Sequence, residues 1–261
     1  MKSILIVNDD GVHSPGIKAA AEAVKPLGKI TIVAPAVQQS GVGRSMSLFR
    51  PVGISRVGVN EYAIDGTPVD AVVVGIYGVL REKPDLIISG INIGGNISCE
   101  VTTSGTVCAA LEGASQGINS ISISLHVKSN TVEQIHSEID FSPAKDILRK
   151  VARRVIEDGL PDGVDLLNIN VPEGAGRKVK FTRLAERMYT TRVQERFDPR
   201  GRKYFWIDGD AIYDAEEGTD VHAVRIENCI SITPLKMDFT SHEAIKEAKK
   251  LEKLLNRQLP L

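Results

Sequence analysis

Near its start the chain reads Ile4-Leu5-Ile6-Val7-Asn8-Asp9-Asp10-Gly11, a short apolar run that ends in two adjacent carboxylates. The run Ile4–Val7 is short and rich in β-branched residues, which predicts a buried strand. Ser14 and Pro15 follow as the cap and the first residue expected of a helix. A buried strand, a polar loop and a helix in succession indicate an α/β domain.

The same alternation of apolar runs and helical patterns continues to residue 177. We expect further strands at Ile30–Ala34, Asp85–Ser89, Ile121–Leu125 and Asp165–Val171. We expect three further helices. One begins at Thr67-Pro68, where Asp70 completes a capping box, and the others span Ser104–Gln116 and Ser142 to about Asp158. Apolar strands separated by helices are typical of a parallel sheet covered on both faces. The sequence therefore predicts an α/β fold, a Rossmann-like three-layer sandwich with a mostly parallel sheet, as a catalytic core over residues 1–177.

Residues 178–261 follow another pattern. Charged and aromatic residues alternate over Lys178–Asp210, and Asp198-Pro199-Arg200-Gly201 is a strong turn signal, so we expect a long β-hairpin. A returning strand at Ile230–Thr233 and a charged C-terminal helix at Ser241–Asn256 complete this part. Because an isolated hairpin is marginally stable, we expect the protruding hairpin and the helix extension to make homo-oligomer contacts; the alternative is that the hairpin folds back on its own domain.

The composition excludes several classes of partner. With 32 basic and 33 acidic residues the net charge is −1, so no overall basic field attracts a nucleic acid duplex. No stretch approaches the ~18 apolar residues of a membrane helix, and the N-terminus lacks the apolar length of a signal peptide. The three cysteines form no C-x-x-C pair. We expect a cytoplasmic protein with reduced thiols and no membrane contact.

Asp9 and Asp10 are the first candidates for chemistry. In open α/β sheets ligands bind beyond the carboxyl ends of the strands, which is where the first strand places these residues. Two adjacent carboxylates repel each other unless a cation lies between them. Mg²⁺ and Mn²⁺ prefer such oxygen ligands. The alternative is an Asx-turn with a helix-cap charge, because aspartates are common in such loops.

Polar residues that suit the same cation follow two other predicted strands. Ser40 lies in a glycine-rich loop, where its hydroxyl can bind a metal or cap a helix. Asn92 and Asn96 lie in the loop that we expect from Ser89 to Asn96, and they supply neutral oxygen ligands or amide donors. A long glycine-containing loop at a strand end is a frequent place for function.

Ser104, Gly105 and Thr106 open a predicted helix. The free amides and the dipole of a helix N-terminus bind anions, although a helix cap needs the same residues without any ligand. Oxygen ligands for a cation beside hydroxyls and amides for an anion describe a phosphoester site, where a metal would withdraw charge and activate water.

These segments resemble the SurE family of 5′/3′-nucleotidases, also called survival protein E. The similar segments, in family order, are Ile6–Val12, Val33–Pro35 with Ser40-Gly41, Gly66–Pro68, Ser89–Asn92, Ser104–Val107, Leu167–Pro172 and Ile230–Leu235. The chain departs from the family pattern at Gly95, where a proline is usual, and at Cys99–Thr103, which lacks the usual apolar residues.

The resemblance implies a set of site residues and a cofactor. A divalent metal, Mg²⁺ or Mn²⁺, would be held by Asp9, Asp10, Ser40 and Asn92. The phosphate would lie near Asn96, Ser104, Gly105 and Thr106. The resemblance also implies a homodimer or homotetramer formed through the hairpin and the C-terminal helix, and in some members cleavage of short polyphosphate.

We therefore expect a metal-dependent phosphomonoesterase, a 5′-nucleotidase, that hydrolyses nucleoside 5′- or 3′-monophosphates with Asp9 and Asp10 as its catalytic residues. The residues do not distinguish attack by water from attack by an aspartate. One alternative is a non-catalytic nucleotide-binding protein on the same fold. The other is a haloacid-dehalogenase-like phosphatase, whose D-x-D motif would need an aspartate at the position of Asn8.

Overall fold

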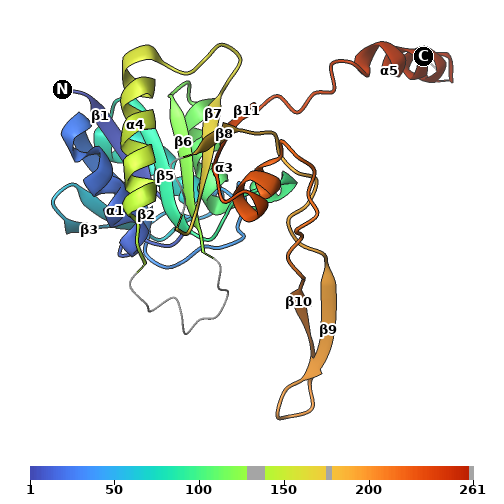
Figure 1. Cartoon of the computed structure of the whole chain (residues 1–261), viewed down its shortest axis with the longest axis horizontal. Coiled ribbons are helices and arrows are strands. Elements are labelled where there is room, and N and C mark those ends of the chain that lie inside the picture. The colour runs from blue at the N-terminus through green and yellow to red at the C-terminus, as the bar shows by residue number, and fades with distance from the viewer. Residues whose placement is uncertain (128–138, 175–177, 259–261) are drawn as a thin grey trace.

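The computed structural model describes residues 1–127, 139–174 and 178–258. Within these residues, nine strands form one sheet in the order β3-β4-β2-β1-β5-β6-β7-β11-β8 (Figure 1). The strands are β1 (Ser3–Val7), β2 (Lys29–Pro35), β3 (Ile54–Gly58), β4 (Glu61–Ile64), β5 (Leu86–Ile93), β6 (Ser120–His126), β7 (Leu166–Pro172), β8 (Val179–Phe181) and β11 (Ile230–Leu235). All neighbours from β4 to β7 run parallel, as predicted.

Helices cover both faces of the sheet, and β1 shows why. Ile4 and Ile6 pack in the same apolar cluster as residues of α1 and α4, whereas Leu5 and Val7 pack with residues of α2 and α3. Because successive side chains of a strand point to opposite faces, an unbroken apolar run supplies two cores at once. The helices are α1 (Pro15–Val24), α2 (Pro68–Val73), α3 (Gly105–Ser115) and α4 (Ser142–Asp158). The predicted three-layer α/β fold is confirmed.

Individual hydrogen bonds confirm the predicted starts of two helices. The Ser14 side chain accepts a hydrogen bond from the amide of Ile17 and caps α1. At α2, Thr67 and Asp70 form both bonds of the capping box. Such caps satisfy amides that have no partner inside the helix, which fixes where the chain leaves the preceding loop.

The predicted end of one central strand is wrong. β5 does not stop at Ser89 but continues to Ile93, with a register shift against β6 between Ser89 and Asn92. Beyond the shift Asn92 pairs with Ser124, so the neighbouring strand satisfies backbone groups that we expected in a loop. Asn92 therefore lies on the sheet itself, whereas Asn96 lies in the loop as predicted.

Two strands, β3 and β4, were not predicted. They pair antiparallel at one edge of the sheet, and Asn60, with a φ of 59°, lies in the turn between them. The residues of β3 are almost all exposed, so no apolar run marks this strand in the sequence.

At the other edge the sheet includes strands from beyond residue 177. β11 pairs antiparallel with β7, and β8 pairs parallel with β11. The returning strand predicted at Ile230–Thr233 is thus a member of the main sheet. The predicted boundary between a core and an extension falls at residues 175–177, outside the described residues, and stays a prediction.

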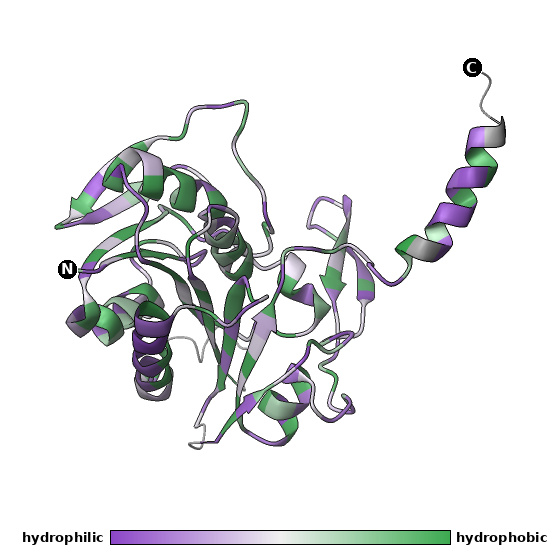
Figure 2. Ribbon diagram, turned by 90° about the horizontal axis from the view of Figure 1, so that it is seen from above, coloured by the Kyte–Doolittle hydropathy of each residue, from purple (hydrophilic) through white to green (hydrophobic). Residues whose placement is uncertain are grey.

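A separate hairpin and a C-terminal helix project from this body (Figure 1). β9 (Arg192–Phe197) and β10 (Lys203–Asp208) form a two-stranded antiparallel sheet, as predicted. α5 (Ile245–Gln258) begins four residues later than expected, and hydrophilic and hydrophobic residues alternate along it (Figure 2). In the part of the chain that the structure describes, no helix combines the length and the apolarity needed to cross a bilayer.

Candidate active site

The turn after β1 is built by Asn8, which is completely buried. Its Oδ1 accepts from the amide of Gly11 at 3.2 Å, and its Nδ2 donates to the carbonyl oxygen of Gly11 at 3.1 Å and to Oγ of Ser14 at 2.8 Å. Gly11 has a φ of 99°, a conformation that side chains disfavour. Because Asn8 makes the turn bonds, the carboxylates of Asp9 and Asp10 are not needed for them.

Asp9 is held by the first turn of α3. Its Oδ1 accepts from Oγ1 of Thr106 at 2.6 Å and its Oδ2 accepts from the amide of Thr106 at 3.2 Å. A Cβ on Gly105 would lie 2.8 Å from both Cβ and Oδ2 of Asp9, so only glycine allows this approach. Asp9 is 5% exposed, and its burial raises the pKa of the carboxyl group against the opposing effect of the Thr106 hydrogen bonds.

Asp10 lies between the ends of β1 and β5. Its Oδ2 accepts from the amide of Ile93 at 3.3 Å. Burial, with the charge of Asp9 as a second cause, raises the pKa of Asp10 to about 6. Within the described ranges no lysine, arginine or histidine forms an ion pair with Asp9 or Asp10. Asp9 is buried and Asp10 is half-buried, and no protein cation among the described residues neutralises the two carboxylates.

A cavity of about 220 Å³ collects most of the residues predicted from the sequence. The predicted residues that line it are Asp9, Ser40, Asn92, Asn96 and Ser104. Three predicted residues, Asp10, Gly105 and Thr106, are not among its lining residues. Thr106 is completely buried, and both its hydroxyl and its amide are directed at Asp9. In this structure Thr106 therefore supports the carboxylate of Asp9, and its predicted part in phosphate binding stays a prediction.

The metal-binding candidates Ser40 and Asn92 are arranged by short polar contacts. Nε2 of Gln38 donates to Oγ of Ser40 at 2.9 Å and reaches Oδ1 of Asp10 at 3.5 Å. Nδ2 of Asn92 donates to the carbonyl oxygen of Gly94 at 2.7 Å. Oδ1 of Asn92 accepts no hydrogen bond from the described residues, so it is the atom of this amide that is free to bind a ligand.

The phosphate candidates Asn96 and Ser104 also have roles within the fold. Oγ of Ser104 accepts from the amide of Val107 at 3.1 Å, so Ser104 is the N-cap of α3, while its O–H can still donate into the cavity. Nδ2 of Asn96 donates to Oγ of Ser124 at 2.8 Å. Ser104 therefore acts as a helix cap, which was one of its two predicted roles, and it also lines the cavity.

The sequence did not reveal what holds the loop of Asn96. The amide of Asn96 donates to Oδ1 of Asn170 at 2.8 Å, and its carbonyl oxygen accepts from the side-chain amides of Asn168 and Asn170. Both asparagines lie on β7 and are completely buried. Polar amides at alternate positions of an apolar strand were the signal for this clamp. Met188 also lines the cavity, and nothing local in its sequence indicates that it does.

The donor set fits a hard divalent cation. It consists of two carboxylates, one amide oxygen and one hydroxyl, and oxygen ligands of this kind suit Mg²⁺ or Mn²⁺. A buried and a half-buried carboxylate side by side are costly without a protein cation, and none is present among the described residues; a bound cation would reduce that cost. In the described chain no three residues among histidine, cysteine, aspartate and glutamate lie together as a metal cluster. Metal binding itself stays a prediction.

Comparison with known proteins identifies the family. A sequence profile described as Survival protein SurE matches residues 4–191. The chain belongs to the SurE family. A protein from Archaeoglobus fulgidus named 5′-nucleotidase SurE is 53% identical over 242 residues, covering 91% of this chain and 92% of the relative. A protein of the same name from Methanocella arvoryzae is 51% identical over 257 residues, covering 95% of this chain and 97% of the relative.

A solved structure is similar to the whole chain. The SurE protein from Aquifex aeolicus matches with a TM-score of 0.82 and 38% identity, over 96% of this chain and 99% of that protein. The prediction that the chain is an enzyme of this family, made from its motifs, is confirmed.

In metal-free buffer, the free energy of unfolding of the wild type should fall relative to that of Asp10→Asn as the pH rises from 4 to 7. Burial raises the pKa of Asp10 from 3.8 to about 6, so the folded state binds this proton more tightly than the unfolded state. The resulting stabilisation is complete below about pH 4 and is lost as the pH passes about 6, by on the order of 2 kcal/mol. Urea denaturation at several pH values measures it. Asp162→Asn, at an exposed position, is the control, and a difference independent of pH would contradict the burial argument.

Proposed function

We propose that this chain is a divalent-metal-dependent phosphatase that hydrolyses nucleoside 5′- or 3′-monophosphates to nucleoside and phosphate. The observation that carries the proposal is the pair of carboxylates formed by the buried Asp9 and the half-buried Asp10, which has no protein counter-ion among the described residues. Asp9 lies against the N-terminus of α3. Carboxylates have no purpose where an anionic phosphate must bind unless a cation lies between them. The names of the relatives from Archaeoglobus fulgidus and Methanocella arvoryzae support the choice of nucleotides.

Asp9, Asp10, Ser40 and Asn92 would hold one Mg²⁺ or Mn²⁺. When bound, such an ion withdraws charge from a phosphate oxygen and lowers the pKa of water. The fit rests on the donor set described above, in which every donor atom is oxygen.

The protein side chains have separate roles in the proposed reaction. Asp9, which Thr106 holds through two hydrogen bonds, is fixed in orientation before the substrate arrives. Asp10 accepts one backbone hydrogen bond from Ile93 and has an oxygen with which to orient the nucleophile. Asn96 and Ser104 also line the cavity, where their donors and the amides at the start of α3 would stabilise charge on the transferring phosphoryl group.

Short polyphosphate is proposed as a second substrate, because the same groups can stabilise the transfer of a terminal phosphoryl group from an anhydride. We also propose a cytoplasmic location, with the thiols of Cys99, Cys108 and Cys229 reduced, as their unpaired state suggests.

We further propose a homodimer or homotetramer held by the hairpin β9–β10 and by α5. Large apolar side chains are exposed on both elements; they include Phe205, Trp206, Ile207, Leu251 and Leu254. Large apolar side chains left in water are costly, and several of them gathered on projecting elements support an interaction role for those elements.

Phosphate release from a substrate panel tests the proposal. The panel contains nucleoside 5′- and 3′-monophosphates, sugar phosphates and short polyphosphate, each with EDTA, Mg²⁺ or Mn²⁺. We expect metal-dependent release that favours nucleotides. Nucleotide binding without release from any compound would instead favour the non-catalytic alternative.

Asp9→Asn and Asp10→Asn should each lower kcat/KM for a nucleoside monophosphate by more than about a hundredfold, because each removes a negative charge and a ligand from the metal site. Both variants should fold, since the amide group is close in size to the carboxyl group. Asp162→Asn makes the same chemical change at an exposed position and should have wild-type activity. Substantial turnover by both site variants would contradict the assignment.

Light scattering at micromolar concentration tests the proposed assembly. The wild type should have the mass of a dimer or a tetramer, and Trp206→Glu should reduce that mass by placing charges in an apolar interface. Val37→Glu, at another exposed apolar position, is the matched control. A monomeric wild type would contradict the role given to the hairpin.

A further inference from the structure

We propose that Asp220, a residue outside the lining of the catalytic cavity, positions Asn96 for phosphoryl transfer. The inference rests on the proposed function, because that function gives Asn96 the task of stabilising charge on the transferring group. Asp220 is completely buried, and among the described residues no lysine, arginine or histidine forms an ion pair with it. A buried carboxylate without a counter-ion needs other polar partners.

Three backbone amides are the partners of Asp220. Its Oδ2 accepts from the amide of Ser98 at 2.8 Å, and its Oδ1 accepts from the amides of Ala185 at 2.9 Å and Val221 at 2.8 Å. The amide of Cys99 also donates to the carbonyl oxygen of Ala185 at 3.0 Å. One carboxylate therefore ties together two segments that lie far apart in the sequence.

The backbone at Ser98 needs such a tie. Ser98 has a φ of 66° and a ψ of −173°, a combination that residues with a side chain rarely adopt and that persists only where the surroundings fix it. Ser98 is completely buried, and so is Ile97, which packs in one apolar cluster with Ala185 and Val221. Among the described residues, Asp220 is the only acceptor for the amide of Ser98.

Both tied segments form walls of the catalytic cavity. Asn96, two residues before Ser98, lines the cavity, and so does Met188, three residues after Ala185. The two buried asparagines of β7 already hold the backbone of Asn96 from one side. Asp220 holds the loop just beyond it, so Asn96 lies between two anchors and its side chain is directed before the substrate binds.

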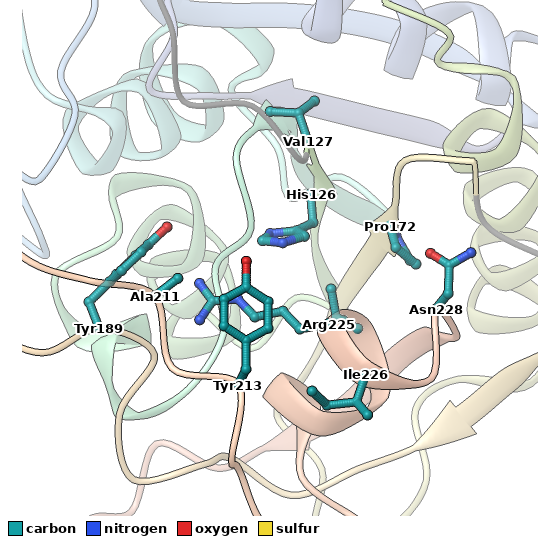
Figure 3. A pocket seen from close by; sticks show the side chains of 10 residues that line it. His126, Val127, Pro172, Tyr189, Ala211, Tyr213, Arg225, Ile226 and Asn228 are labelled. Atoms are coloured by element: carbon teal, nitrogen blue, oxygen red, sulfur yellow. The ribbon is translucent and has the colours of Figure 1, made fainter.

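The segment of Met188 has a further anchor that the loop of Asn96 lacks. Arg225 lies on the short helix η4 (His222–Ile226), and its Nη1 donates to the carbonyl oxygen of Met188. Figure 3 shows the side chain of Arg225 extending toward Tyr189, the next residue, and its guanidinium carbon lies 4.8 Å from the centroid of that ring. A change at Asp220 should therefore act mainly on the loop of Asn96.

Asp220→Asn in the full chain tests the assignment, because it keeps the shape of the side chain and removes one acceptor. The amide oxygen can still accept from Ala185 and Val221, which leaves the NH2 group facing the amide of Ser98, donor against donor. Asp165→Asn is the matched control. Asp165 is half-buried, and its Oδ2 also accepts from a backbone amide, that of Met237, away from the cavity lining.

The kinetic constants should separate positioning from metal binding. In Asp220→Asn, kcat for adenosine 5′-monophosphate should fall at least about tenfold, because a small misplacement of a group that stabilises the transition state is costly. The dissociation constant for Mn²⁺ should change by less than about twofold, since Asp220 makes no hydrogen bond to Asp9, Asp10, Ser40 or Asn92. Asp165→Asn should have the wild-type kcat.

A double-mutant cycle tests whether Asp220 acts through Asn96. In the background of Asn96→Ala, the further change Asp220→Asn should lower kcat by less than about twofold, because the side chain that it positions is already absent. An unchanged kcat in Asp220→Asn, a tenfold loss that persists in the Asn96→Ala background, or a loss of Mn²⁺ binding would each overturn the role. If Asp220→Asn does not fold, Asp220→Ser replaces it, and failure of both to fold would overturn the role as well.

Hydrogen exchange of the wild type and the variants supplies a readout without turnover. Exchange of the amides of residues 97 and 98 should accelerate at least about tenfold in Asp220→Asn and stay unchanged in Asp165→Asn. Equal exchange in the wild type and Asp220→Asn would contradict the anchoring of the loop. A wild type that releases no phosphate from any substrate would contradict the proposed function, and accelerated exchange in Asp220→Asn would still support the anchoring of Asn96.

Discussion

The hydrogen bonds from Thr106 to Asp9 are the contact on which the rest of the site depends. They join the end of β1 to the start of α3, two segments separated by almost a hundred residues. Gly105 lets the helix approach, and Asn8 makes the turn that directs the carboxylate toward it. The helix end thereby lies beside a buried negative charge that it only partly satisfies. The proposed cation would complement that arrangement and would in turn attract an anionic substrate.

Much of this fold could be predicted from local sequence. The apolar runs that became β1, β2, β6 and β7 predict buried parallel strands because both of their faces are covered. The caps at Ser14 and Thr67 predict helix starts because unpaired amides need acceptors. The edge strand β3 was missed because its side chains are exposed and carry no apolar signal. The end of β5 was misplaced because pairing with β6, a long-range contact, continues through a glycine-rich segment.

The candidate site, too, could be predicted from local sequence only in part. Residues in the turn after a strand, such as Asp9 and Asp10, could be named because topology brings strand ends together. Thr106 was predicted to bind phosphate because its hydroxyl lies at the start of a helix. In the structure this hydroxyl donates to the carboxylate of Asp9, which follows β1. Met188 reaches the cavity from a distant segment whose path the local sequence does not specify. Sequence thus indicates which chemistry is present, whereas packing determines which group each side chain meets.

The central claim is that the pair Asp9 and Asp10 exists to hold one divalent cation. Titration calorimetry of Mn²⁺ into metal-free protein at pH 7 tests it most directly, with Asp9→Asn for comparison. We expect saturable binding of one ion per chain in the wild type and its loss in Asp9→Asn. Absence of saturable binding in the wild type, or equal binding in Asp9→Asn, would contradict it.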